Sequence, residues 1–274
     1  MSKGFNRFTV VMLWVVLAFM YIPIIAIIGM SFNGTAYGMF PYEFTLKWYQ
    51  ALFTTSNLLP ACWLSLKFSF LVTVFSVIVG TLTSFGLQYL PPKWADRFNS
   101  VMQLPIIIPW LVTSISLLLL FTFIGLTRSY FTMFLGNVIV VLPYVVLLVN
   151  GRFVSLDRTP ESAAKLLGAS PVRVFFDITF PAILPGILAG GIMSLIVCFN
   201  NFVLQYYLSP IGVNTLPVSV FTRIKGGYQA DLNALSAIII VIAVAIVIAM
   251  SKLGYSAGNL FGGVGSTNTK KENK

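Results

Sequence analysis

Seven of the 24 charged side chains of this sequence lie in residues 152–181, between two long apolar runs. Charged groups in a short loop of an apolar chain offer ion pairs and hydrogen bonds to a soluble partner. The segment therefore predicts a docking surface for another protein, and an amphipathic loop lying on lipid headgroups is the alternative. Its bases and acids are Arg152, Asp157, Arg158, Glu161, Lys165, Arg173 and Asp177.

A second group of polar side chains lies in the apolar run that follows residue 181. Several of them are separated by four, seven or eleven positions, which are close to whole helical turns, so they fall near one helical face. Such a face avoids lipid, because amide and hydroxyl groups need hydrogen-bond partners. It indicates a solute pathway or contacts between helices, with Gly186 and Gly190 as a packing seam. The candidate pathway residues are Ser194, Asn200, Asn201 and Gln205.

The sequence offers little of the chemistry that enzymes use. It has no histidine, and Cys62 and Cys198 are too far apart for metal-ligand spacing. The apolar runs contain no acidic residue, whereas ion-driven carriers use ionisable groups at membrane depth. These features disfavour a membrane-embedded enzyme and an autonomous secondary carrier, which are the two alternatives to a subunit driven by a partner. They also predict no metal and no cofactor in this chain.

The composition is that of an integral membrane protein. Hydrophobic residues make up 58% of the chain and charged residues 9%, against about 25% charged in soluble domains. Six apolar segments have about the 20 residues that a membrane-crossing helix needs. Prolines at positions 109, 143 and 185 fall in the third, fourth and fifth segments, where each permits a kink. The predicted spans are Val10–Met30, Leu64–Leu87, Val101–Phe123, Tyr130–Asn150, Ala182–Leu208 and Ala234–Gly254.

The basic residues predict how the spans are oriented. With the N-terminus inside, twelve bases face the cytosol and four face outward, which is a positive-inside bias rather than a nucleic-acid-binding pattern. We therefore expect a cytosolic N-terminus (1–9), a single all-α transmembrane domain (10–255) with a cytosolic loop (151–181), and a disordered cytosolic tail (256–274).

The cytosolic loop contains signals for two short helices. Thr159 and Pro160 form a helix start, with Glu161 favouring the positive end of the helix dipole. Gly168 is a C-terminal stop that is free to adopt a positive φ. Ser170 and Pro171 repeat the start signal for a second helix through Thr179, which Pro181 is expected to end before the fifth span.

The spacing in this loop resembles the EAA loop of binding-protein-dependent ABC importer permeases, whose pattern is Glu-Ala-Ala-x3-Gly-x9-Ile-x-Leu-Pro. Two positions depart from that pattern: Ser162 replaces the Glu, with Glu161 one place earlier, and Phe180 replaces the Leu. The resemblance implies a coupling helix that sits in a groove of a cytosolic ATPase. The residues to which it assigns this role are Glu161, Ser162, Ala163, Ala164, Gly168, Ile178 and Pro181.

Further segments are similar to the spermidine/putrescine-type branch of that family. The resemblance implies a type I importer fold in a bacterial inner membrane, with a second permease subunit, two ATPase subunits that hold ATP and Mg²⁺, and an external solute-binding protein. Branch members carry acidic residues near 200–201, where this chain has asparagines, so neutral, zwitterionic and anionic solutes stay open beside polyamines. The segments are Tyr21–Pro23, Phe44–Tyr49, Leu104–Pro109 and Thr215–Val218.

Overall fold

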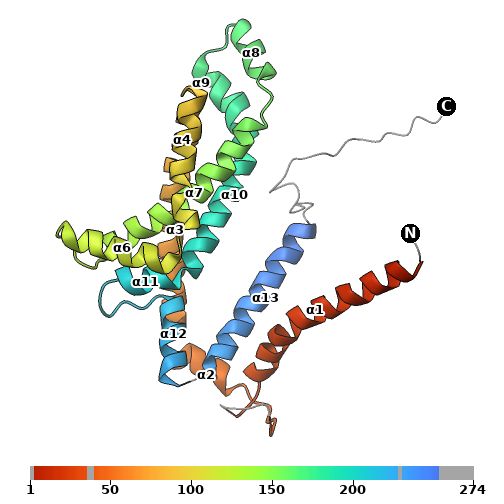
Figure 1. Cartoon of the computed structure of the whole chain (residues 1–274). Coiled ribbons are helices and arrows are strands. Elements are labelled where there is room, and N and C mark those ends of the chain that lie inside the picture. The colour runs from red at the N-terminus through yellow and green to blue at the C-terminus, as the bar shows by residue number, and fades with distance from the viewer. Residues whose placement is uncertain (1–2, 36–39, 228–229, 253–274) are drawn as a thin grey trace. The chain divides into compact units, whose positions relative to one another are not determined.

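The computed structural model describes residues 3–35, 40–227 and 230–252, and within these residues every regular element is a helix (Figure 1). The tail 256–274, for which the sequence predicts disorder, lies outside the described residues. Contacts divide the chain into two compact units. The first comprises the residues up to Trp63 together with Ser219–Ala249, and the second is centred on Leu64–Val218. The single permease domain over 10–255 stays a prediction.

The first unit contains α1 (Lys3–Ser31), α2 (Lys47–Thr54) and most of α13 (Asp231–Lys252). Hydrogen bonds tie the end of α1 and the segment after it to α2. The Ser31 hydroxyl lies 2.7 Å from the Tyr49 hydroxyl, and the Trp48 indole N–H donates to the Asn33 carbonyl at 2.6 Å.

A buried ion pair joins three further segments of the first unit. Asp231, at the start of α13, is 7% exposed, and its Oδ2 accepts hydrogen bonds from Arg223 at 2.6 Å and from Ser56 at 2.8 Å. Arg223 lies on α12 (Leu216–Gly226). Arg223 is one of the four bases that the positive-inside pattern places outside, and its pairing with Asp231 is a structural finding.

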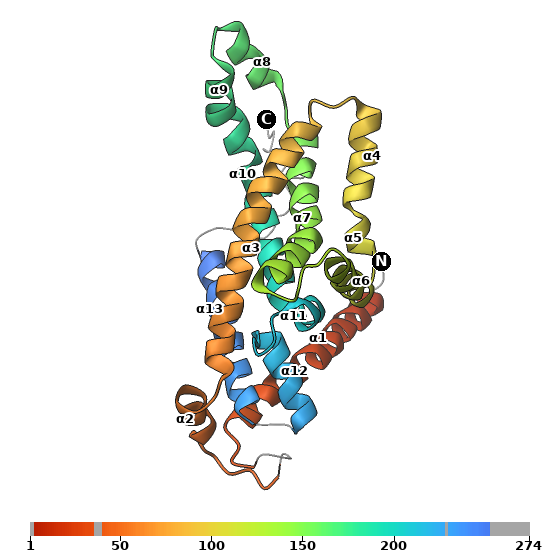
Figure 2. The same cartoon turned by 90° about the vertical axis from the view of Figure 1, so that its left-hand side faces the viewer.

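The second unit is built on α3 (Leu58–Leu87), α7 (Tyr130–Val154) and α10 (Phe180–Asn200), which run side by side (Figure 2). Its core is a cluster of buried side chains from these three helices and from α6 (Trp110–Phe123) and α11 (Phe202–Leu208). The members include Phe68, Val72, Leu117, Val140, Val141, Val197, Cys198 and Leu204.

Glycines bring α10 against α7. A Cβ on Gly190 would stand 3.1 Å from the Val145 Cα, and one on Gly186 would stand 2.9 Å from the Leu148 carbonyl oxygen. Small residues permit this backbone approach between membrane helices. The expected packing seam is therefore present in the structure.

The third predicted span is not one helix. The structure divides it among α4 (Pro92–Met102), α5 (Leu104–Ile107) and α6 (Trp110–Phe123), with a bend of 103° between the α4–α5 pair and α6. Ile108 and Pro109 are extended at the bend, because a proline disfavours helical backbone in the residue before it and has no N–H to donate. The described residues thus hold five helices long and apolar enough to span a membrane, or six if the bent pair is one span.

The fifth predicted span also needs correction. Helix α10 ends at Asn200, and α11 (Phe202–Leu208) starts anew after Asn201, whose ψ of 83° breaks the helix. At the other end, Pro181 does not end the preceding helix, because the helical run from Pro171 to Asn200 continues through it. Helix α7 runs through Pro143 and α10 runs through Pro185.

Candidate functional site

The charged loop folds as two short helices with a glycine corner. Helix α8 spans Thr159–Leu166, Gly168 has a φ of +84°, and α9 spans Pro171–Val174. The Ser170 hydroxyl accepts a hydrogen bond from the Arg173 N–H at 3.4 Å, so it caps α9 as its sequence position predicts. These helices project beyond the ends of α7 and α10 (Figure 1).

The start of α8 differs in detail from the prediction. Thr159 is the first helical residue rather than the cap, and its N–H donates to the Asp157 carboxylate at 2.9 Å. Hydrogen bonds from the Thr159 side chain and backbone hold the pKa of Asp157 below its ordinary value. Asp157 is therefore an anion that favours the positive end of α8.

One face of α8 is uncharged and exposed. Ser162 and Ala163 are exposed on it, and Leu166 and the following Leu167 are 89% and 88% exposed. Residues three and four apart share a helical face, so these side chains form one continuous surface. We call this surface, consisting of Ser162, Ala163, Leu166 and Leu167, the outer face of α8.

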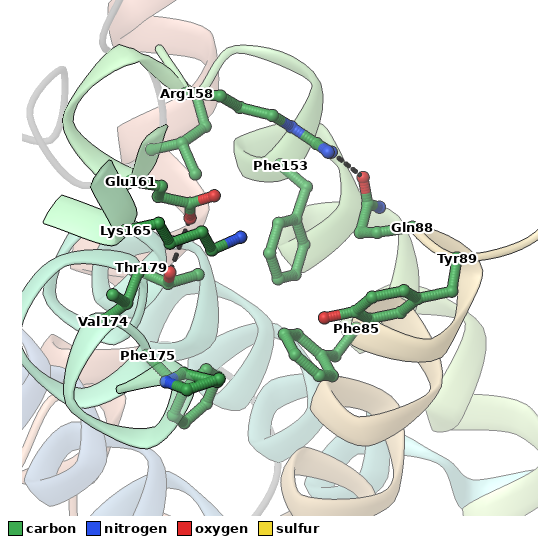
Figure 3. A pocket seen from close by; sticks show the side chains of 12 residues that line it. Phe85, Gln88, Tyr89, Phe153, Arg158, Glu161, Lys165, Val174, Phe175 and Thr179 are labelled. Atoms are coloured by element: carbon green, nitrogen blue, oxygen red, sulfur yellow. Dashed lines mark hydrogen bonds between the residues drawn. The ribbon is translucent and has the colours of Figure 1, made fainter. Parts of the chain in front are cut away.

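Glu161 lies on the opposite side of the same helix. Its Oε1 accepts a hydrogen bond of 2.5 Å from the hydroxyl of Thr179, a residue that is 6% exposed (Figure 3). Ala164 is half-buried on this inner side. The one-residue displacement of the carboxylate from the family pattern thus turns it by about 100°, away from the outer face.

Thr179 is placed by an irregular turn. Residues Phe175–Thr179 form a π-helical turn, η1, between α9 and α10. Ile178 is half-buried in this turn and Pro181 is exposed at the start of α10, so the two positions that end the family pattern lie at the base of the loop, apart from the outer face of α8. A π turn carries one more residue than an α turn, which changes the direction of the side chains that follow.

A cavity of about 150 Å³ lies under α8 (Figure 3). One wall is aromatic, with Phe85, Phe153 and Phe175; Phe85 contacts both other rings, at centroid distances of 6.2 and 5.2 Å. At the rim the Arg158 guanidinium donates to Gln88 at 2.8 Å. The Gln88 amide donates in turn to Asn150 on α7 at 2.9 Å, so the end of α3 is linked to α7 and to the loop.

The structure separates the four candidate pathway residues. Ser194, Asn201 and Gln205 are fully buried, whereas Asn200 is exposed and its amide donates to the Ile196 carbonyl of its own helix. The predicted shared face is interrupted, because α10 ends before Asn201.

The buried members have structural partners. The Ser194 hydroxyl donates to Thr73 on α3 at 3.4 Å, and the Asn201 Oδ1 caps α11 by accepting from the Leu204 N–H at 3.0 Å. The Gln205 amide donates to the Cys198 carbonyl at 2.7 Å. Within the described part of the chain, the Asn201 Nδ2 and the Gln205 Oε1 are buried without a hydrogen-bond partner.

A basic side chain fixes the loop that follows α11. The Arg128 guanidinium donates to the carbonyls of Tyr206 and Ser209, each at 3.0 Å. These carbonyls lie at the C-terminal end of α11, where no further helical N–H groups follow. The loop then exposes Ile211 to 91%.

Sequence reasoning missed several residues that shape these sites. Phe175 falls in the variable nine-residue stretch of the family pattern, and Thr179 is the variable position between Ile178 and Phe180. Phe85 and Gln88 lie at the end of an apolar run. Their roles depend on contacts between distant segments, and only the polar Gln88 at the end of an apolar run could have drawn attention.

Comparison with known proteins identifies the family. The family described as "Binding-protein-dependent transport system inner membrane component" matches residues 73–257. The "Spermidine/putrescine transport system permease protein PotC" of Haemophilus influenzae is 31% identical over 248 residues, which cover 90% of this chain and 96% of that protein. The "Putrescine transport system permease protein PotI" of Escherichia coli strain K12 is 30% identical over 84% of this chain and 85% of that protein.

Two solved structures have the same fold. One is a bacterial ABC transporter involved in the import of the acidic polysaccharide alginate, with a TM-score of 0.70 at 17% identity, covering 92% of this chain and 95% of that chain. The other is the MetNI methionine ABC transporter in an inward-facing conformation, with a TM-score of 0.58 at 15% identity, covering 72% and 94%. The chain thus belongs to the binding-protein-dependent transport system inner membrane components, and it is a permease subunit of an ABC importer rather than an enzyme.

Proposed function

We propose that this chain works in an importer with a second permease subunit, two copies of a cytosolic ATPase and an external solute-binding protein. Both of its termini face the cytosol. The imported solute is a polyamine or a similarly small polar molecule, which is supported by the 31% identity to a spermidine/putrescine permease over 90% of this chain. Transport proceeds by alternating access of the pathway to the two sides of the membrane.

The observation that carries this proposal is the outer face of α8. Two leucines that are nearly 90% exposed lie in the most highly charged loop of the chain, which the positive-inside bias assigns to the cytosol. Burial of each against a partner would contribute about 1.5–3 kcal/mol. The neighbouring Ala163 has a small side chain, so a partner surface can come close to the helix backbone.

The energy of transport comes from outside the chain in this proposal. The sequence lacks the Gly-x4-Gly-Lys-Ser/Thr pattern that cradles nucleotide phosphates. ATP and Mg²⁺ would bind in the ATPase subunits, and closure of these subunits would move α8. No cofactor is assigned to this chain.

The pathway in this chain would include Ser194, Asn201 and Gln205, with Asn200 at its margin. The Asn201 Nδ2 and the Gln205 Oε1 are buried without partners among the described residues, and such groups would gain hydrogen bonds from a passing polar solute. Two of these side chains also make structural hydrogen bonds, because Ser194 joins α10 to α3 and Asn201 caps α11.

Docking is tested by co-purification of the ATPase with the assembled importer. We expect Leu166→Asp and Ala163→Arg to lower the ATPase recovered by about tenfold, as does loss of an interface hot spot. Leu90→Asp is the matched control, because Leu90 is an exposed leucine in the loop after α3. Full recovery of the ATPase with both variants would refute docking through α8.

Transport is tested in proteoliposomes that contain the assembled importer, with ATP in the lumen and the binding protein outside. We expect ATP-dependent accumulation of spermidine or putrescine, and none when ATP is omitted. Accumulation by this chain alone without ATP would instead support a secondary carrier. Accumulation of a neutral sugar but of neither polyamine would leave the importer intact and overturn the solute class.

A further inference from the structure

We propose that Glu161 and Thr179 form a latch that positions the coupling helix α8 on the start of α10, so that movement of α8 is transmitted to the membrane helices. The inference rests on the proposed docking of the ATPase at α8. It assigns to Glu161 an internal role in place of direct contact with the ATPase.

The first support is the direction of the Glu161 side chain. The outer face of α8 is uncharged, because Ser162, Ala163, Leu166 and Leu167 supply it. Glu161 instead points toward η1, where its Oε1 meets the Thr179 hydroxyl at 2.5 Å. A partner that covers the outer face would therefore meet apolar and hydroxyl groups and would leave the carboxylate where it is.

The second support is the strength of this hydrogen bond relative to its neighbours. The acceptor is a carboxylate and the donor is 6% exposed, so the bond belongs to the strong class of hydrogen bonds and is partly shielded from water. A second hydrogen bond between the loop and the end of α3, from Arg158 to Gln88, involves an exposed guanidinium. Water competes for that exposed pair, so it is the weaker tether.

The third support is the place of Thr179 in the fold. Thr179 ends the π-helical turn η1 and directly precedes α10, which continues to Asn200. Helix α8 packs on α9 and η1, and beside these contacts lies the cavity of about 150 Å³. Because the cavity lies on one side of α8, we expect a displacement of α8 to reach α10 through η1 and the Glu161–Thr179 hydrogen bond.

The path beyond the latch is helix α10 itself. Helix α10 is held closely against α7 at Gly186 and Gly190, and it carries Ser194 toward α3. A displacement of its first turn is therefore passed along the helix to the polar residues near Asn201. The latch sets how much solute moves per ATP hydrolysed, whereas the outer face of α8 sets whether the ATPase binds.

The test compares matched variants of the whole importer in proteoliposomes. Thr179→Val keeps the shape and removes the donor, and Thr179→Ser restores the hydroxyl. Glu161→Ala removes the acceptor, and Glu161→Gln keeps an acceptor oxygen without the charge. The measurements are the ATPase that co-purifies, the rate of ATP hydrolysis, and the solute accumulated per ATP hydrolysed.

We expect Thr179→Val and Glu161→Ala to bind the ATPase as the wild type does, but to accumulate about tenfold less solute per ATP, the effect of losing one hydrogen bond to a charged group. Thr179→Ser should transport like the wild type, and Glu161→Gln should be intermediate. The double variant Glu161→Ala/Thr179→Val should be no worse than either single variant, because both remove the same bond.

Wild-type transport per ATP in Thr179→Val and Glu161→Ala, or additive losses in the double variant, would overturn the latch. Because Thr179 is buried, Thr179→Val can fail to assemble; Glu161→Ala then decides alone, since Glu161 is only half-buried. Failure of the docking proposal gives a different result, namely wild-type ATPase recovery with Leu166→Asp and Ala163→Arg.

Discussion

Gly186 of α10 lies against the backbone of α7 so closely that a Cβ would stand 2.9 Å from the carbonyl oxygen of Leu148. A backbone oxygen cannot rotate away, so an added methyl group forces the two helices apart. Overpacking of this kind costs about 1–3 kcal/mol. The close approach therefore depends on the absence of a side chain at one position.

We expect Gly186→Ala to lower the thermal unfolding temperature of the purified chain in detergent. We also expect it to lower solute uptake, because the added methyl group shifts α10. Gly86→Ala is the matched control, because a Cβ on Gly86 in α3 meets nothing within 4 Å. That variant should be neutral or stabilising by about 0.5–1 kcal/mol, since alanine loses less backbone entropy in a helix. Equal unfolding temperatures for both variants would show that the α7–α10 contact accommodates the added methyl group without loss of stability.

The parts of the fold that follow from local rules could be predicted from the sequence. Gly168 and Ser170 were identified as a helix stop and a helix cap, and both have those roles in the structure. Each is decided by the backbone preferences and hydrogen bonds of residues within one turn. The Gly186–Gly190 seam was predictable for the same reason, because small residues four apart share a helix face.

The rest of the fold and of the candidate site depends on contacts between distant residues, which hydropathy does not reveal. The third and fifth apolar segments read as continuous spans, but α6 turns away at Pro109 and α11 restarts after Asn201, whose side chain caps it. The partner of Glu161 lies 18 residues away, at the end of a π-helical turn that no residue pattern signals. Hydrophobic periodicity reports the length of an apolar segment and not the points at which it bends.

The corner at Gly168 gives a prediction about the docking helix. Its φ of +84° is costly for residues with a Cβ, by about 1–2 kcal/mol, although asparagine adopts it more readily than alanine. We expect Gly168→Ala to reorient α8 and reduce the ATPase that co-purifies, with Gly168→Asn closer to the wild type. Hydrogen exchange of residues 159–167 reports the orientation change, and identical exchange in both variants would contradict it.

The start of α8 is expected to depend on pH through Asp157. Its pKa is lowered by the Thr159 side chain and then by the Thr159 N–H, so the carboxylate is favoured in the folded loop. A depressed pKa means that this stabilisation is present above the ordinary Asp value of 3.8 and is lost as pH falls through the folded-state pKa.

Carboxyl ¹³C NMR of Asp-labelled protein measures this directly. Thr159→Val keeps the N–H and removes the hydroxyl, so the pKa of Asp157 should rise toward its ordinary value. Ser155→Ala is the control, because the Ser155 hydroxyl bonds to the Arg152 carbonyl and not to Asp157. An unchanged pKa of Asp157 in Thr159→Val would show that the Thr159 hydroxyl is not what lowers that pKa.

The loop after α11 should depend on Arg128. Its planar guanidinium reaches the Tyr206 and Ser209 carbonyls together, a fork that an ammonium group cannot reproduce. We expect Arg128→Ala to raise hydrogen exchange in residues 204–214 by an amount equivalent to about 1–3 kcal/mol, with Arg128→Lys between it and the wild type.

The exposed Ile211 belongs to the same loop. The half-saturating concentration of the binding protein in uptake assays should therefore rise most in Arg128→Ala and less in Arg128→Lys. Arg97→Ala, an exposed arginine on α4, should change neither measurement. If exchange rises in Arg128→Ala while the dependence on binding protein stays the same, the guanidinium holds the loop but the loop does not meet the binding protein.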